Sequence, residues 1–127
     1  MSVNFITSCL VGLRRSLASS DAIVPDLWHL EASNILLRAE KNGELTIGEV
    51  ERFISQLENL PIQVDLLTAR QSFSRTLVLG RTYNLSSYDA AYLELAIRES
   101  IPLTTIDKNL TKAAKKADVQ IYLNEPK

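Results

Sequence analysis

The chain has 127 residues, 46% of them hydrophobic, which is enough for a single domain over residues 1–127 with its own core. Its 14 Lys and Arg against 15 Asp and Glu give a net charge of −1, without the basic excess of a general nucleic-acid binder. No stretch approaches the roughly 18 consecutive apolar residues of a membrane helix, and no signal-peptide pattern is present. The lone Cys9 excludes an internal disulfide, and together these features favour a cytoplasmic protein.

Short apolar runs alternate with longer segments of helical period, which is typical of helices that connect the strands of a parallel sheet. The expected strands are residues 22–24, 62–64, 103–106 and 119–123, with residues 3–7 as a possible fifth. Each run is too short for a helix, and three are rich in β-branched residues. The sequence therefore predicts an α/β fold with a central, mainly parallel sheet of four or five strands.

The first two expected helices carry clear start and stop signals. Residues 26–41 are preceded by Pro25 and followed by Asn42 and Gly43, which are residue types that commonly start and end a helix. Residues 46–60 form the second, with Thr46 as N-cap and Glu49 three positions later as its capping-box partner. These signals predict two consecutive helices before the strand at 62–64.

Three further helices are expected in the second half of the chain. Asn84 suits the left-handed position after residues 66–83, Ser86 begins a helix over 86–99, and residues 108–117 form the last one. The helix at 66–83 is predicted from an apolar stripe of Leu66, Ala69, Phe73, Leu77 and Gly80.

One acidic residue stands within the apolar stripe of the first helix. Glu31 has Leu27 and Ile35 one turn away on either side, so it is expected to point along the apolar face. Burying an unpaired carboxylate is costly, and such a residue usually has a cation, a metal or a hydrogen-bond donor beside it. Glu31 is thus either a site residue or an acid at the rim of the core, paired with an arginine.

Two other acids stand at the starts of expected helices. Asp89 lies three positions after Ser86, where it could simply cap the helix, although it also shares a face with Tyr92. Asp107 follows a strand at its carboxyl end, where open α/β sheets bind ligands, but it would also serve as an N-cap. If these acids and Glu31 converge, a divalent cation would have to neutralise them, and oxygen ligands suit Mg²⁺ or Mn²⁺.

Three blocks of sequence, in this order, resemble the PIN domains of VapC toxins. They are VPDLWHLEASNIL at residues 24–36, LSSYDAAYLELA at 85–96 and LTTIDKNL at 103–110. The resemblance implies a three-layer α/β/α fold whose catalytic acids, Glu31, Asp89 and Asp107, bind Mg²⁺ or Mn²⁺ and cleave RNA. It also implies that the hydroxyl of Thr105 supports Asp107.

The resemblance fails at the N-terminus, where PIN domains of this type have a strand that ends in Asp. No acid precedes Asp21 here, so residues 1–21 form an atypical or truncated part, or the start site is misassigned. An empty central slot would leave backbone hydrogen-bonding groups unpaired on both neighbouring strands, so we expect residues 3–7 to fill it and residues 9–18 to form a short crossover helix. Asn4, Thr7 or Ser8 would then offer neutral oxygens in place of the missing carboxylate.

The leading hypothesis is a metal-dependent endoribonuclease of the toxin-antitoxin type, a homodimer that is silenced by a VapB-like antitoxin. The alternative is a degenerate, inactive PIN domain that binds protein or RNA. Lys108 and Lys112 lie on a basic helix face beside Asp107, which either holds RNA phosphates or is simply solvated.

The aromatic residues and the single histidine have less specific interpretations. Trp28, Tyr88 and Tyr92 could stack on RNA bases, although packing in the core or an interface is favoured for them. His29 has no neighbour with the spacing of a zinc ligand, so we expect it at the surface.

Overall fold

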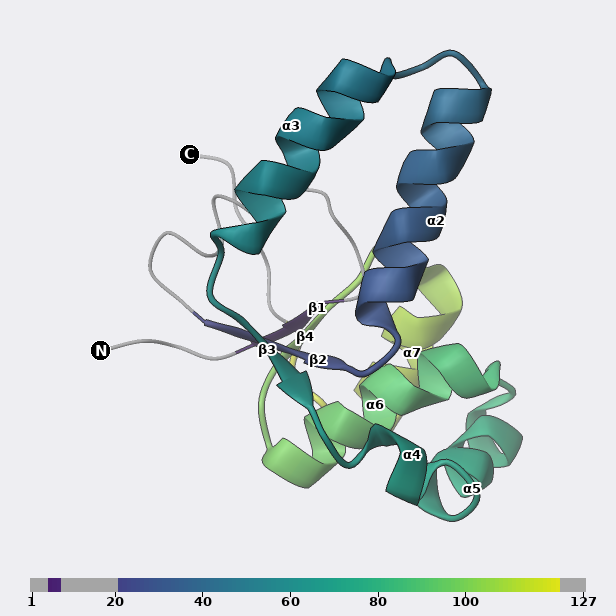
Figure 1. Ribbon diagram of the computed structural model, residues 1–127. Helices are drawn as coiled ribbons and strands as arrows, with labels where there is room; N and C mark the ends of the chain where they lie inside the picture. The colour runs from purple at the N-terminus through teal and green to yellow at the C-terminus, as the bar shows by residue number, and fades with distance from the viewer. Residues whose placement is uncertain (1–4, 8–20, 122–127) are drawn as a thin grey trace.

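A parallel sheet lies at the centre of the protein (Figure 1). The structure is a computed structural model, and it describes residues 5–7 and 21–121. The strand order is β3-β2-β1-β4, and every neighbouring pair is parallel. The predicted α/β class with a parallel sheet is therefore confirmed. The strands are β1 (Phe5–Thr7), β2 (Ala22–Pro25), β3 (Ile62–Asp65) and β4 (Leu103–Thr104).

The central slot of this sheet is filled by β1. Its backbone pairs with β2 at Phe5 and Ile6, and with β4 at Ile6 and Thr7. The strand expected at residues 3–7 is thus present in a shorter form, between the two strands that would otherwise have lost their partner. The expected helix at residues 9–18 lies outside the described residues, as do Asn4 and Ser8.

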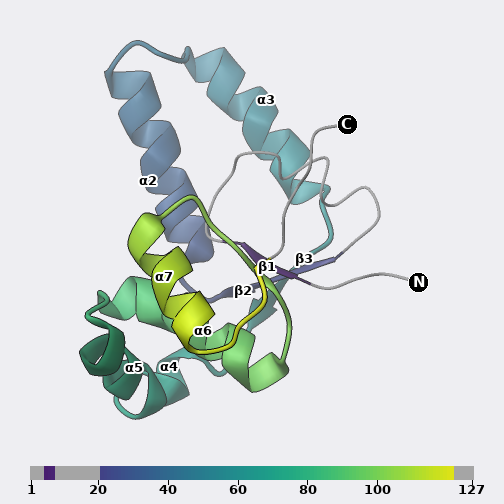
Figure 2. The same ribbon diagram turned by 180° about the vertical axis from the view of Figure 1, so that it is seen from behind.

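Helices cover the sheet from two sides (Figures 1 and 2). In both views α2 (Trp28–Lys41) and α3 (Ile47–Glu58) form a hairpin that projects to one side, and α4 (Thr68–Gln71), α5 (Arg75–Tyr83) and α6 (Ser87–Glu99) lie on the other. The last described helix is α7 (Lys108–Lys116), which packs against α6. None of the described helices has the length and apolar character needed to cross a membrane.

The core is built around α6, which contacts β1, β2 and β4 as well as α5 and α7. Its residues 90–96 are all buried, and all of them except Glu94 are alanine, leucine or tyrosine, as expected for a helix enclosed between a sheet and other helices. Trp28 of α2 and Leu110 of α7 contribute their side chains to the same core. The helix that carries Asp89 is therefore the most rigidly enclosed element of the described chain.

The capping signals read from the sequence are confirmed. Thr46 and Glu49 form the reciprocal capping box at the start of α3, and Ser86 accepts a hydrogen bond from the backbone N–H of Asp89 at the start of α6. Asn84 has the left-handed conformation, with φ 55°, after α5. The exception is α2, which begins two positions later than expected and has no side-chain cap at Leu27.

The prediction of a single helix over residues 66–83 is wrong. The structure has two helices there, α4 and α5, which are separated by a turn at residues 72–74. The hydroxyl of Ser72 donates to the carbonyl of Thr68 at 2.9 Å, and the backbone of Ser74 leaves the helical region. Serine hydroxyls compete in this way with the helical ladder. The break turns the expected apolar stripe outward, and Phe73 is 93% exposed.

The two strands expected near the C-terminus are also shorter than predicted. The strand expected at 103–106 ends at Thr104, and Ile106 is 74% exposed. From the strand expected at 119–123, the described part contains one parallel bridge, between Leu103 and Ile121. The remainder lies outside the described residues.

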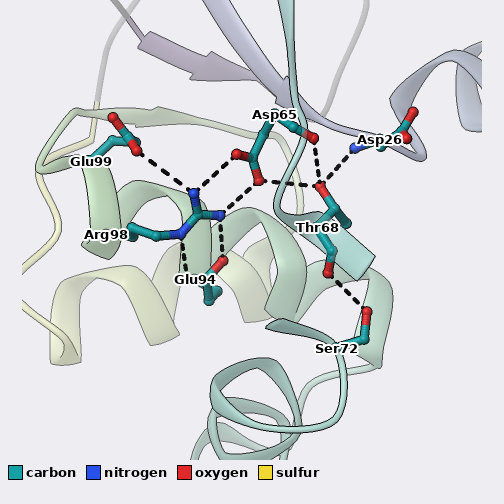
Figure 3. Close-up of polar contacts among 7 residues, drawn as sticks. All are labelled: Asp26, Asp65, Thr68, Ser72, Glu94, Arg98 and Glu99. Carbon is teal, nitrogen blue, oxygen red and sulfur yellow. Dashed lines mark hydrogen bonds and ion pairs between the residues drawn. The ribbon is translucent and has the colours of Figure 1, made fainter. Parts of the chain in front are cut away.

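A buried ionic network fixes the end of β3 to α6 (Figure 3). Arg98 donates two hydrogen bonds to Asp65, at 3.0 and 2.7 Å, and two to Glu94, both at 2.8 Å. Glu99 lies 3.6 Å from the same guanidinium, and Thr68 donates to Asp65 at 3.2 Å. Every described buried side-chain nitrogen or oxygen has a hydrogen-bond partner, so no buried polar group of this cluster is left unsatisfied.

Candidate functional site: three acids at the carboxyl end of the sheet

Glu31 lies in the first turn of α2 and is partly buried. Its Oε1 accepts a hydrogen bond of 2.6 Å from the hydroxyl of Tyr92, whose side chain is 1% exposed. The alternative of a rim acid paired with an arginine is not found among the described residues, since every ion pair there involves Arg98. Glu31 is therefore held by a neutral donor, the hydroxyl of Tyr92.

Asp89 occupies the third position of α6, and Glu49 occupies the same position of α3. The pKa of Glu49 is lowered, first by hydrogen bonds with the backbone and side chain of Thr46. The pKa of Asp89 is raised, first by burial, then by the negative charge of Asp107, and then by that of Glu31. A pure capping acid would behave like Glu49, because a helix N-terminus stabilises negative charge. Asp89 therefore differs from Glu49, whose side chain completes a capping box with Thr46.

Asp107 follows β4 and is the N-cap of α7. Its Oδ1 accepts a hydrogen bond of 2.8 Å from the backbone N–H of Leu110, so the capping role considered from the sequence is present. Thr105 accepts a hydrogen bond of 3.0 Å from the backbone N–H of Asp107, which fixes the turn between strand and helix. The side chain of Asp107 is exposed, and no described residue donates a hydrogen bond to its Oδ2.

The three acids are brought to the same end of the sheet by different elements. Tyr92, which holds Glu31, lies one turn after Asp89 on α6. Glu31 follows β2 and Asp107 follows β4, and these two strands lie on either side of β1. Because neighbouring strands are about 5 Å apart, the carboxyl ends of β2 and β4 are separated by about 10 Å. The electrostatic effect of both acids on Asp89 agrees with this placement.

These acids suit a divalent cation in kind and charge, but they do not form a complete ligand cage. Among the described residues, no three His, Cys, Asp or Glu side chains are grouped closely enough to hold a metal ion. Mg²⁺ usually keeps several waters and needs only one or two protein carboxylates. Burial and then the negative charges of Asp107 and Glu31 raise the pKa of Asp89, and a bound cation would relieve the repulsion among the three acids.

The aromatic residues divide between core and surface. Trp28 and Tyr92 are buried and cannot stack on a base, which confirms the favoured interpretation for both. Tyr88 is 62% exposed, so it is not part of the core, and its packing in an interface stays a prediction. His29 is exposed as expected, with its ring against that of Trp28.

The lysines beside Asp107 are exposed, and they differ in their surroundings. Lys112 lines a cleft between α5 and α7, whereas Lys108 does not. A larger cleft, of about 640 Å³, lies elsewhere, between α2 and α3. It is mainly apolar and contains none of the three acids, so its size does not mark it as the chemical site.

Sequence reasoning missed the role of Tyr92 as the donor that orients Glu31. The only sequence signal was that Tyr92 shares a helix face with Asp89, and this does not identify a partner 61 positions away. It also missed the network of Arg98, although Glu94 and Arg98 stand four positions apart on one helix, the spacing of an ion pair.

Comparisons with known proteins identify the fold alone. No protein-family model matches the sequence, and no curated protein matches it. The crystal structure of PAE2754 from Pyrobaculum aerophilum is similar, with a TM-score of 0.68 over 89% of this chain and 87% of that chain. Its sequence is 20% identical, so the likeness establishes a shared architecture and leaves activity to be argued from the site.

Proposed function

We propose that this protein is a metal-dependent endoribonuclease with a three-layer PIN-like fold, a VapC-like toxin that hydrolyses RNA phosphodiesters. The observation that carries the proposal is the convergence of Glu31, Asp89 and Asp107 from three elements, with Asp89 partly buried and repelled by the other two. Carboxylates that repel one another in a partly buried position, and so have a shifted pKa, are typical of catalytic or binding sites. The resemblance in sequence around the same three acids supports the same function.

In this proposal the described residues act by holding carboxylates in place. Tyr92 fixes Glu31, and Thr105 together with the N–H of Leu110 fixes Asp107. Asp89 is positioned by the rigid start of α6. A bound Mg²⁺ or Mn²⁺ would supply activation of the attacking water and stabilisation of charge on the phosphate and the leaving oxygen.

The direct test is cleavage of a structured RNA by the purified chain with Mg²⁺ or Mn²⁺. We expect cleavage by the wild type, its loss in EDTA, and its loss in Asp89→Asn and Asp107→Asn. Glu49→Gln is the matched control, because it removes a carboxylate from the same helix position outside the site. Cleavage that persists in both Asn variants, or falls equally in the control, would refute the assignment.

The alternative is a catalytically inactive PIN-like module that binds protein or RNA. It is favoured by the absence of a grouped set of three ligands among residues 5–7 and 21–121. The absence of any acid before Asp21 favours it as well. Thermal unfolding with increasing Mn²⁺ separates the two functions. A ligand that binds only the folded state raises its stability by about 2.7 kcal/mol at a hundred times its Kd. An inactive module would show no saturable shift at millimolar Mn²⁺.

In this proposal the protein acts in the cytoplasm, and its partners are a VapB-like antitoxin and a second copy of the chain. Their support is a set of exposed apolar side chains beside the acids, since Leu30, Tyr88 and Ile106 each directly precede one of them. Exposed apolar groups around a charged site are typical of a surface that is covered by a partner. Size-exclusion chromatography with light scattering tests the homodimer.

A further inference from the structure

The cleft that Lys112 lines is formed by the end of α5 and by α7. Its volume is about 340 Å³. One wall carries Lys112 and Lys116, which stand one helical turn apart, and the other carries the residues at the end of α5. No acidic residue lines it. The lining residues are Thr82, Tyr83, Asn84, Asn109, Lys112, Ala113 and Lys116.

The two lysines of this cleft carry charges that the described residues do not neutralise. Every ion pair in the described part of the chain involves Arg98, and α7 contains no acid between its cap and its end. The α7 face that includes Leu110 and Ala113 is anchored in the core. The lysines are therefore held on a fixed helix, where they form a localised positive surface in a chain of net charge −1.

The opposite wall is equally well fixed. Asn84 has the left-handed conformation that ends α5, and the N–H of Leu85 donates to the carbonyl of Gly80 at 3.0 Å. A Cβ at Gly80 would lie 3.2 Å from the carbonyl oxygen of Leu85, so this corner has little room to shift. The wall opposite the lysines thus contributes the side chains of Thr82, Tyr83 and Asn84, which carry hydroxyl and amide groups.

We propose that this cleft binds the phosphate backbone of single-stranded RNA, which then continues along α7 to the acids. The proposal rests on the proposed ribonuclease function. Lys112 lies five positions and Lys116 nine positions after Asp107, or about 7 and 14 Å along the helix axis. Ammonium groups bind phosphate as point charges, and amides or hydroxyls complete such contacts without reading the base.

The experiment measures binding of a fluorescently labelled single-stranded RNA of mixed sequence by anisotropy, in EDTA so that no cleavage occurs. The test variant is Lys112→Gln/Lys116→Gln. Its charge-matched control is Lys41→Gln/Lys115→Gln, which removes two exposed lysines that do not line the cleft. Thermal unfolding of all three proteins checks that these surface changes leave the fold intact.

We expect the test variant to bind RNA roughly 2- to 30-fold more weakly, the loss expected for two exposed charge pairs. The slope of log K against log salt should fall by about 1.4, because each phosphate contact on a single strand contributes about 0.7. The control should retain both the affinity and the slope.

Three results would overturn the proposal. They are equal losses in both double variants, no measurable RNA binding by the wild type, and tighter binding of poly-glutamate than of RNA, which would assign the cleft to an acidic protein. The ribonuclease proposal is judged separately, by metal-dependent cleavage. Wild type that binds RNA through the cleft without cleaving it would leave the cleft assignment standing and refute only the nuclease.

Discussion

Replacing Arg98 tests whether the buried network is the main polar contact that fixes β3 to α6. Arg98→Met removes four hydrogen bonds and leaves the carboxylates of Asp65 and Glu94 without their cation. The side chain of Glu94 is 3% exposed, that of Asp65 9% and that of Arg98 16%, so water can replace the guanidinium only in part. Removing one partner from a buried ionic network costs about 3–5 kcal/mol.

We therefore expect Arg98→Met to lower the free energy of unfolding by about 3–5 kcal/mol, against a typical total of roughly 5–15 kcal/mol. Urea unfolding followed by circular dichroism gives this value through linear extrapolation. Arg38→Met is the control, because Arg38 is exposed and makes no described ion pair, and it should change the stability by less than about 0.5 kcal/mol. A loss below about 1 kcal/mol in Arg98→Met would refute the argument.

Two further variants identify the source of the loss. Arg98→Lys keeps the positive charge but not the planar group that bonds two carboxylates, so its stability should lie between those of wild type and Arg98→Met. Arg98→Met/Asp65→Asn also removes one of the two carboxylates that Arg98→Met leaves without a cation. It should therefore recover part of the lost unfolding free energy. Full additivity of the two single changes would show that Arg98 and Asp65 are not coupled.

Three other predictions follow from contacts at the candidate site and in the network. Tyr92→Phe should lose about 1–3 kcal/mol of unfolding free energy in a urea titration and should reduce RNA cleavage, because Glu31 loses its donor; unchanged values of both would contradict the role given to this contact. Asp89→Asn should raise the melting temperature in EDTA, because it removes a repelled charge, and should abolish any stabilisation by Mn²⁺; a lower melting temperature would argue against the repulsion. The pKa of Asp65 is lowered, mainly by hydrogen bonds from Arg98, so at acid pH the unfolded chain binds more protons than the folded one. Its contribution to stability should be complete above its ordinary pKa of 3.8 and should be lost as the pH falls through the lower folded value, which urea titrations at a series of pH values measure.

The parts of the fold that the sequence predicted well are those set by local interactions. The capping box of Thr46 and Glu49, the cap at Ser86 and the left-handed Asn84 each depend on residues within a few positions of one another. The central position of β1 was predicted for a different reason, because an empty slot would have left the backbones of β2 and β4 unpaired.

One failure arose from local hydrogen bonds within a helix, and the other from a long-range contact. The stripe from Leu66 to Gly80 has helical period, but serine hydroxyls interrupt the ladder and the side chain of Phe73 faces solvent. The donor for Glu31 comes from Tyr92, and a contact across 61 positions leaves no mark in either local sequence. Periodicity indicates which residues repeat on a face, but it does not identify what that face contacts.

The contrast between the two acidic clusters is the reason we propose a metal-dependent site over an inactive module. Around Arg98 the protein supplies its own cation to the carboxylates of Asp65 and Glu94. Around Asp89 no described residue forms an ion pair with the acids, and burial, followed by the negative charges of Asp107 and Glu31, raises its pKa. Asn at this position would fit the same helix turn and remove the repulsion. A chain that keeps the carboxylate there accepts a loss of stability, and such a loss is typical of residues retained for their chemistry.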